Sequence, residues 1–365
     1  EKTINKNPKL LKAELFTNHI KIKNRWLIMV RVAINGFGRI GRMFLKAALT
    51  DKKIKVVAIN DLTHPETLAT LFQYDSVHGK FPKNVTATKT GIKIANQSIP
   101  IFAEKDPAKL PWKKLKVDIV LESTGFFTNP DFATLHLFAG AKKVLLSAPA
   151  KPKDNTKTKH QTIVYGVNEK DYKKTKKSVH IISNASCTTN SVAPTLKVIQ
   201  DSFGITNCFF TTIHGYTSTQ RLVDGPHKDL RRARAAAVNI IPSSTGADIA
   251  TTEVLPILKG KIRGTAFRVP IPDGSVTDFV IQTKKKVTVE TVNKVLEKAS
   301  KGKLKEILEY STHDLVSKDI IGNPHSAIID SKLTKVLGNN TVKIVAWYDN
   351  EWGYSCRLVD LVKIL

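Results

Sequence analysis

The chain has 365 residues, which is long enough for two domains that each bury a core of their own. Apolar residues make up 41% of the chain, yet no uninterrupted apolar run is long enough to span a membrane, so the sequence predicts a soluble globular protein. The three cysteines lack paired or metal-ligand spacing, which argues against a disulfide framework or a metal site and favours a reducing, cytoplasmic environment.

The charge of the chain is strongly basic. Lysine and arginine total 58 against 31 aspartates and glutamates, a net charge of +27, and such a field attracts small phosphates or nucleic acid. A solvated basic surface is the simpler explanation, because no zinc-finger spacing, RNA-recognition motif or recognition helix occurs. We therefore expect nucleic-acid binding at most as a secondary, salt-sensitive activity, and keep a nucleic-acid-binding protein as the alternative from another functional class.

Residues 1–28 differ in character from the rest of the chain. They are rich in lysine and asparagine, and Met29 stands immediately before a strong strand pattern. We expect a flexible, dispensable N-terminal extension, from a misassigned start or from a sequence added for expression. A targeting peptide is the alternative, but no hydrophobic segment with a small-residue cleavage site is visible.

From Val30 the pattern is that of a dinucleotide-binding fold. Strands expected at 30–35 and 54–60 flank a glycine turn and a helix expected at 42–49, and the second strand ends at Asp61. The turn reads Gly36-Phe37-Gly38-Arg39-Ile40-Gly41. Its first glycine permits the tight turn, the second lets the backbone approach a pyrophosphate, and the third lets the helix pack closely on the strand.

The residue after the second strand indicates which dinucleotide is bound. The Asp61 carboxylate can accept hydrogen bonds from ribose hydroxyls, and its charge would repel a 2′-phosphate. Leu62 follows it and offers no cation for such a phosphate. The sequence therefore favours NAD over NADP.

Two further strands, at 117–122 and 143–147, and a helix at 129–139 continue the alternation. This order predicts a doubly wound parallel sheet with helices on both faces. Cofactors bind at the carboxyl ends of such strands, which makes Ser123, Thr124 and Ser147 candidate neighbours of the cofactor. Ordinary polar turns at strand ends are equally common.

The next motif is Ser183-Asn184-Ala185-Ser186-Cys187-Thr188-Thr189-Asn190. It stands between a strand expected at 179–182 and a helix expected at 191–203, in which Pro194 should cause a kink or limit the first turn. Free backbone N–H groups at a helix start favour the thiolate form of Cys187, which is the nucleophilic form. An inert buried thiol is the alternative.

His214 ends a strand expected at 207–214 and is a candidate base for the thiol. A nucleophilic cysteine beside NAD predicts aldehyde oxidation. The thiolate adds to the aldehyde to give a hemithioacetal, hydride leaves for the nicotinamide, and an acceptor attacks the remaining thioester. A purely structural histidine at a strand end is the alternative.

Several residues can bind anions. Hydroxyl and backbone donors occur at Ser186, Thr188, Thr245 and Gly246, and guanidinium groups at Arg232 and Arg268 match phosphate geometry. Two hydroxyl clusters and two arginine segments predict two phosphate-binding sites. The alternative for each arginine is a solvent-exposed residue that only contributes to solubility.

The second half of the chain predicts an α+β domain with a mainly antiparallel sheet. Strands are expected at 264–269, 275–285 and 342–348, helices at 289–299 and 304–309, and a final apolar helix within 350–365 that packs on the first domain. The expected divisions are an extension at 1–28, an NAD-binding domain at 29–186 completed by 350–365, and a catalytic domain at 187–349.

From Val30 to the C-terminus, the chain resembles phosphorylating glyceraldehyde-3-phosphate dehydrogenases. The resemblance rests on the glycine turn, the cysteine motif and four further segments, Asp224-Gly225-Pro226, Ser244-Thr245-Gly246-Ala247, Ala266-Phe267-Arg268-Val269-Pro270, and Trp347 to Ser355. It implies that Cys187 is the nucleophile and His214 its base. The attacking inorganic phosphate would be held by Ser186, Thr188, Thr245, Gly246 and Arg232, and the C3 phosphate of the substrate by Thr217, Thr219 and Arg268.

The resemblance also implies an NAD site and a homotetramer in which residues 216–238 line a neighbour's cofactor site. The expected cofactor-binding residues are Asn35, Gly36, Phe37, Gly38, Arg39, Ile40, Gly41, Asp61, Ser123, Thr124, Ser147, Asn350 and Tyr354, with Asn350 fixing the nicotinamide amide. The chain departs from the family in its leader, its basic charge and Thr219, where many bacterial members carry aspartate. Another phosphorylated aldehyde, such as erythrose 4-phosphate, remains an alternative substrate.

Overall fold

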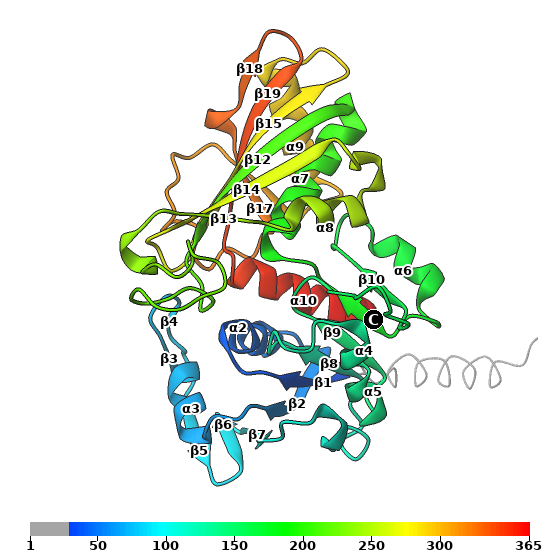
Figure 1. Cartoon of the computed structure of the whole chain (residues 1–365), viewed down its shortest axis with the longest axis vertical. Helices are drawn as coiled ribbons and strands as arrows, with labels where there is room; N and C mark the ends of the chain where they lie inside the picture. The colour runs from blue at the N-terminus through cyan, green and yellow to red at the C-terminus, as the bar shows by residue number, and fades with distance from the viewer. Residues whose placement is uncertain (1–28) are drawn as a thin grey trace, which may run out of the picture.

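The computed structural model describes residues 29–365, which form two large β-sheets with their helices and one small hairpin (Figure 1). The first sheet is mostly parallel and the second is mainly antiparallel, so the predicted fold class is confirmed. The residues before 29, with the predicted extension, lie outside the described part.

The first sheet has nine strands in the order β10-β11-β9-β8-β1-β2-β7-β6-β5. Neighbouring strands from β10 to β7 run parallel, and β6 and β5 add an antiparallel edge. The strands are β1 (Val30–Asn35), β2 (Ile54–Asn60), β5 (Val85–Thr88), β6 (Gly91–Ile94), β7 (Gln97–Phe102), β8 (Ile119–Glu122), β9 (Lys143–Leu146), β10 (His160–Thr162) and β11 (Ile181–Ser183).

Helices and loops cover both faces of this sheet because alternate strand residues are apolar on each side. Val32 and Ile34 face α2 (Arg39–Ala48) and the C-terminal α10 (Trp352–Ile364), while Ala33 between them belongs to a separate cluster around Trp112. Helix α10 packs against α2, so the end of the chain contributes to the core of the first sheet (Figure 1). The remaining elements of this half are α3 (Pro65–Gln73), β3 (Tyr74–Asp75), β4 (Gly79–Lys80), η1 (Pro107–Lys109), α4 (Pro130–Ala133), α5 (Leu135–Phe138) and α6 (Glu169–Thr175).

The second sheet has the order β13-β14-β12-β15-β19-β17-β16, and β18 also pairs with β19. Two of its neighbouring pairs, β12–β14 and β16–β17, are parallel. Its elements are β12 (Ile205–Gly215), η2 (Ala236–Val238), β13 (Ile241–Ser243), α8 (Ala247–Val254), η3 (Pro256–Leu258), β14 (Ile262–Val269), β15 (Ser275–Thr283), α9 (Val289–Lys301), β16 (Leu308–Ser311), β17 (Ala327–Asp330), η4 (Ser331–Leu333), β18 (Lys335–Leu337) and β19 (Thr341–Tyr348).

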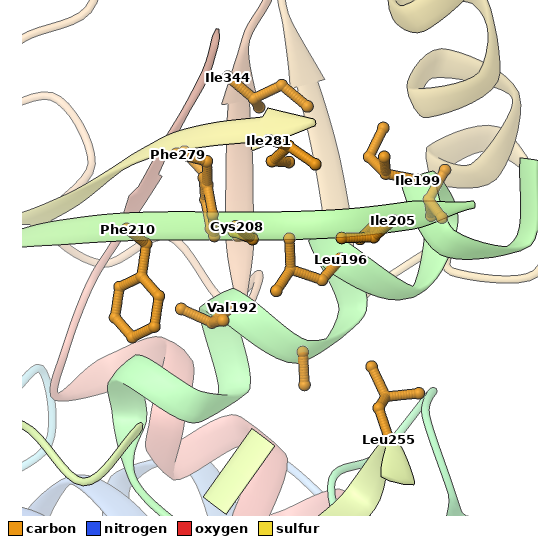
Figure 2. Packing of buried hydrophobic residues seen from close by; sticks show 14 of the residues in the cluster. Val192, Leu196, Ile199, Ile205, Cys208, Phe210, Leu255, Phe279, Ile281 and Ile344 are labelled. Carbon is orange, nitrogen blue, oxygen red and sulfur yellow. The ribbon is translucent and has the colours of Figure 1, made fainter. Parts of the chain in front are cut away.

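Helix α7 (Cys187–Phe203) lies across one face of this second sheet. Val192, Leu196 and Ile199 are fully buried against apolar side chains of β12, β15 and β19 (Figure 2). The helix runs without interruption through Pro194. The apolar stripe that predicted this helix is therefore the contact that anchors Cys187 to the second sheet.

Several predicted boundaries were wrong. Helix α7 begins at Cys187 and α2 at Arg39, so both helices start inside the motifs that were expected to precede them. The helix expected at 129–139 is two short helices, α4 and α5. The helix expected at 304–309 does not form, because Leu308 and its successors pair with β17 as strand β16. Within residues 29–365, no helix has the length and apolar character needed to cross a bilayer.

Candidate active site

Cys187 is presented by a sharp turn between β11 and α7. Ala185 in this turn has a φ of +53°, a left-handed conformation that strains a residue with a Cβ atom. The Tyr354 hydroxyl donates to the Ala185 carbonyl at 3.0 Å, and the Ser186 hydroxyl accepts from the Thr189 N–H at 3.0 Å as the helix cap. These contacts hold the first turn of α7 and with it the sulfur.

His214 lies near the carboxyl end of β12, a central strand of the second sheet. Its Nε2 atom is 3.4 Å from the Cys187 Sγ atom. Its Nδ1 atom is 2.7 Å from the Gly215 carbonyl oxygen, and the tautomer that donates an Nδ1–H to this carbonyl has a lone pair on Nε2. This geometry suits transfer of the thiol proton to the imidazole.

Burial keeps both members of this pair neutral. It raises the pKa of the Cys187 thiol, and the Arg268 charge and the Thr188 hydrogen bonds offset only part of that effect. Burial, followed by the Arg268 charge, lowers the pKa of His214 to about 3. The helix start was expected to favour the thiolate, but desolvation of the sulfur outweighs this influence.

Arg268 is the cation nearest to the pair. It stands beside His214 in the register of β14 and β12, and its Nη1 atom lies 2.7 Å from His214 Nδ1. The same nitrogen donates to the Gly215 carbonyl at 2.9 Å. A guanidinium in such a partly buried place attracts an anion, and neutralising its charge would make His214 a stronger base.

One cavity of about 530 Å³ brings most of the predicted catalytic and nicotinamide-side residues together. It opens between the two sheets, next to Cys187 and His214. Predicted residues that line it are Arg39, Ile40, Ser147, Ser186, Thr217, Asn350 and Tyr354.

Asn350 is held at this cavity from two sides. Its Oδ1 atom accepts from the Ser275 hydroxyl at 2.5 Å, and its backbone N–H donates to Asp273 at 3.2 Å. With the carbonyl oxygen occupied, the side-chain NH₂ group is the part that can reach a ligand.

Arg39 does not present its guanidinium to the cavity as a free group. It donates to Glu351 through Nε at 2.8 Å and through Nη2, and to Asp75 at 2.8 Å. Although burial opposes its charge, Glu351 and then Asp75 raise the pKa of Arg39. Its backbone N–H in the first turn of α2 remains the donor suited to a phosphate.

A second cavity of about 520 Å³ lies beside the glycine turn, lined by the predicted residues Asn35, Gly36, Gly38, Asp61, Ser123 and Thr124. Gly36 has a φ of +91°, and a Cβ atom there would lie 2.7 Å from the Thr124 nitrogen. A Cβ on Gly38 would meet nothing within 4 Å, and no side chain caps α2 at this position. The turn thus offers open backbone at a helix N-terminus, which fits the pyrophosphate of NAD.

The other predicted residues lie outside the linings of these two cavities. Phe37 and Gly41 serve packing, since Phe37 stacks on Phe72 and a Cβ on Gly41 would lie 2.3 Å from the Gly36 carbonyl oxygen. The Thr188 hydroxyl is 3.0 Å from the Tyr348 hydroxyl, inside the protein.

The remaining candidates belong to two polar groups. Arg232 lies beside the Ser244 carbonyl at 3.4 Å, next to Thr245 and Gly246 at the start of α8. Thr219 contacts the Thr217 hydroxyl at 2.9 Å.

The sequence did not single out several residues that shape the site. Tyr348 bridges the hydroxyls of Thr188 and Thr212, at 3.0 and 2.7 Å, and its ring lies edge-on to His214. Ser275 orients Asn350, and Phe126 stands 84% exposed at the glycine-turn cavity. For Tyr348, its position in the segment from Trp347 to Ser355 was the available signal.

A parallel dinucleotide-binding sheet that shares a cavity with a half-buried cysteine and a buried histidine defines an NAD-dependent oxidoreductase. Two family profiles match the chain, the glyceraldehyde 3-phosphate dehydrogenase NAD-binding domain over residues 30–130 and the C-terminal domain over 186–350. The chain therefore belongs to the glyceraldehyde-3-phosphate dehydrogenase family, and its cofactor is NAD.

Curated relatives agree with this assignment. The chain is 53% identical over 332 residues to glyceraldehyde-3-phosphate dehydrogenase of Geobacillus stearothermophilus, covering 91% of this chain and 97% of that protein. It is 52% identical over 333 residues to glyceraldehyde-3-phosphate dehydrogenase 2 of Streptomyces avermitilis, with the same coverage.

Proposed function

We propose that this chain oxidises D-glyceraldehyde 3-phosphate to 1,3-bisphosphoglycerate, with NAD as oxidant and inorganic phosphate as acceptor. The observation that carries the proposal is the 3.4 Å contact between Cys187 Sγ and His214 Nε2 beside the cavity that Asn350 lines. Membership of the family and the names of its relatives support the same reaction.

The first step forms a bond between sulfur and carbon. His214 Nε2 takes the thiol proton, the sulfur attacks the aldehyde carbon, and the imidazolium passes the proton to the former aldehyde oxygen, which gives a hemithioacetal on Cys187 and a neutral His214. Before substrate binds, Cys187 and His214 are both neutral. Burial and then the Arg268 charge lower the pKa of His214, and a substrate phosphate near Arg268 compensates that charge and so favours the proton transfer. The binding of substrate thereby strengthens the base that acts on it.

The second step converts the hemithioacetal into a thioester. Bound NAD supplies the acceptor for the hydride that leaves the former aldehyde carbon. His214 holds the proton of the hemithioacetal hydroxyl as that oxygen becomes a carbonyl. Asn350 offers its NH₂ group to the nicotinamide amide, and Ser275 keeps that group in orientation.

The third step releases the product. An oxygen of inorganic phosphate attacks the thioester carbon, the carbon–sulfur bond breaks, and the sulfur leaves as the Cys187 thiolate, which takes back a proton from His214. We assign the attacking phosphate to Ser186, Thr188, Thr245, Gly246 and Arg232, and the C3 phosphate to Thr217, Thr219 and Arg268. Burial lowers the pKa of Arg268, and the charge of Arg232 adds a smaller effect in the same direction, which supports neighbouring phosphate sites.

The assembly and location are part of this proposal. We infer a homotetramer in which residues 216–238 line a neighbour's cofactor site, and a cytoplasmic enzyme. The exposed apolar side chains of Leu222, Leu230 and Val238 support an interface along this segment. We also infer an NAD-binding domain at 29–186 completed by 350–365, and a catalytic domain at 187–349.

The test is NADH formation from glyceraldehyde 3-phosphate with inorganic phosphate present or omitted. We expect turnover that depends on phosphate, and a higher kcat/KM than for erythrose 4-phosphate. Cys187→Ser should abolish turnover and retain NAD binding, because the glycine turn is a separate element, whereas Cys208→Ser serves as the matched control. Preference for the four-carbon aldehyde, or turnover by Cys187→Ser, would contradict the proposal.

A further inference from the structure

A buried carboxylate that the proposed reaction does not use stands behind the glycine-turn cavity. Glu122 is the last residue of β8, and its side chain is 1% exposed. Asn35, the last residue of β1, lies beside it in the register of the two neighbouring strands (Figure 1). Among the residues that the structure describes, no lysine or arginine forms an ion pair with Glu122. A buried carboxylate without a cation depends on hydrogen-bond donors.

Three neighbouring residues supply those donors. Glu122 Oε2 accepts from the side-chain NH₂ group of Asn35 at 2.6 Å and lies 3.1 Å from His136 Nε2. Glu122 Oε1 accepts from the Thr124 N–H at 2.8 Å and also from the Thr124 hydroxyl. Each carboxylate oxygen therefore has two partners, which is the number that its two lone pairs can take.

Trp112 fixes the direction of the hydrogen bond between His136 and Glu122. The indole Nε1–H of Trp112 donates to His136 Nδ1 at 3.1 Å. Because an indole N–H can only donate, Nδ1 is the acceptor, and the ring proton is on Nε2, which donates it to Glu122. Both rings are fully buried, so no solvent competes for these hydrogen bonds.

The same hydrogen-bonded network continues from Glu122 into the lining of the cavity. Asn35 Oδ1 accepts from the NH₂ group of Asn60 at 2.7 Å. The side chain of Asn60 also donates to the Glu104 carbonyl and accepts from the Glu104 N–H, both at 2.9 Å. The cavity of about 520 Å³ is lined in part by four members of the network, Asn35, Asn60, Glu104 and Thr124. Glu122 thus orients polar groups of the lining from behind.

We propose that Glu122 is a positioning residue for the adenosine half of NAD. It fixes the side-chain amide of Asn35 and the hydroxyl of Thr124, at the carboxyl ends of β1 and β8, before the cofactor binds. Groups that are already ordered in the free protein lose little conformational entropy when a ligand binds, so this arrangement raises the affinity. The nicotinamide end belongs to the other cavity, where Ser275 orients Asn350. This role depends on the NAD cofactor alone and is the same for any aldehyde substrate.

Glu122→Gln tests this role because it keeps the size of the side chain and exchanges one oxygen for an NH₂ group. That NH₂ group faces either the Thr124 N–H or the donors of Asn35 and His136, so a donor meets a donor in both orientations. ADP-ribose lacks nicotinamide and therefore reports on the adenosine half alone. In calorimetric titrations of the full chain, Glu122→Gln should raise Kd for NAD and for ADP-ribose about 10- to 100-fold. It should also raise KM for NAD and change kcat at saturating NAD less than about twofold.

His136→Phe is a second variant with a milder change. It keeps a ring at this position and removes the donor to Glu122 and the acceptor for Trp112. Because Glu122 keeps its hydrogen bonds to Asn35 and Thr124, the affinity for ADP-ribose should fall by only about 2- to 10-fold. This variant tests the role of the network even if Glu122→Gln does not fold.

The matched control is Glu309→Gln in β16 of the second sheet. Glu309 likewise accepts from an asparagine, Asn323 at 2.8 Å, and lies 3.0 Å from a histidine, His325. Glu309→Gln should leave the affinity for ADP-ribose unchanged, whatever it does to the melting temperature. Unaltered ADP-ribose affinity in either folded variant of the network, an equal loss in the control, or a fall in kcat as large as the rise in KM would each overturn the proposal. ADP-ribose binding is measured without aldehyde, so its outcome is separate from any failure of the proposed dehydrogenase reaction.

Discussion

Arg268 Nη1 lies 2.7 Å from His214 Nδ1, so the base of the proposed reaction touches a guanidinium. In this arrangement the cation disfavours the protonated imidazole until an anion arrives. The relationship links recognition of the substrate phosphate to activation of the cysteine, and it leads to the first prediction.

Arg268→Gln should raise the pKa of His214 above its value of about 3, because a positive neighbour is removed. It should also lower kcat/KM for the phosphorylated aldehyde about 10- to 100-fold, the effect of losing a charge-assisted hydrogen bond of about 1.5 to 3 kcal/mol. Both changes can be measured by NMR titration of the imidazole and by steady-state kinetics.

Arg263→Gln is the control, since this arginine is exposed on the same strand. An aldehyde without phosphate should be oxidised by the Arg268→Gln variant at least as fast as by the unaltered protein, because His214 is then the stronger base. Equal losses for both aldehydes would contradict the role of Arg268 as an anion seat.

The second prediction concerns His78, whose Nε2 atom lies 3.2 Å from Glu351 and 3.4 Å from Asp273. Burial opposes its charge, but Asp273 and Glu351 outweigh that effect and raise the pKa of His78 to about 9. The folded state therefore binds more protons than the unfolded state between about pH 6.5 and about pH 9. The stability from His78 is fully present below about pH 6.5 and is lost as the pH rises through about 9.

Urea unfolding at a series of pH values should show a decline of up to about 3 kcal/mol across this window, and a smaller decline for His78→Gln. Asp349, whose pKa burial and then Asp273 raise to about 8, titrates in the same direction, so the comparison with the variant is required. The exposed His64→Gln should behave like the unaltered protein. Parallel curves for all three proteins would refute the His78 assignment.

The third prediction separates folding from cofactor binding at the glycine turn. Gly36→Ala should lower stability by about 2 to 4 kcal/mol, because the φ of +91° and the Thr124 backbone leave no place for a Cβ atom. Gly38→Ala should keep the melting temperature, since its Cβ atom meets nothing, and lose at least tenfold in NAD affinity. Calorimetric unfolding and NAD titration would test both expectations. If Gly38→Ala bound NAD with unchanged affinity, the pyrophosphate would not bind next to Gly38.

The fourth prediction concerns the hydroxyl that the sequence did not single out. Tyr348→Phe leaves the Thr188 and Thr212 hydroxyls without their shared partner and should cost about 1 to 3 kcal/mol of stability. It should also reduce kcat, because the Tyr348 ring beside His214 is then no longer hydrogen-bonded to Thr188 in the first turn of α7. Tyr310→Phe, half-buried in the same half of the chain, is the control, and an equal effect there would show that only generic packing was lost.

Local patterns were sufficient for the elements that hold the cofactor. The strands at 30–35 and 54–60 coincide with β1 and β2, because apolar runs bounded by glycine and polar residues fix them locally. The segment at 304–309 was mistaken for a helix because its strand identity comes from pairing with β17, a partner that no local pattern reveals.

The protonation states of Cys187 and His214 could not be predicted from the sequence for a similar reason. The position of Cys187 at a helix start is visible locally, but its burial depends on the packing of both sheets, and burial decides its pKa. The Arg268–His214 contact joins residues of separate strands and follows from their parallel register. Tertiary packing therefore decides the pKa values of Cys187 and His214, which the local motifs do not determine.

Helix α10 covers one face of the first sheet, although it is synthesised after every strand of the second. While the chain emerges from the ribosome, the apolar side chains of Val32, Ile34 and their neighbours stay exposed on one face until residues 352–364 have been synthesised. The nucleotide-binding half thus matures last, although its strands are made first, and that interval is when a nascent chain of this protein most needs protection from aggregation.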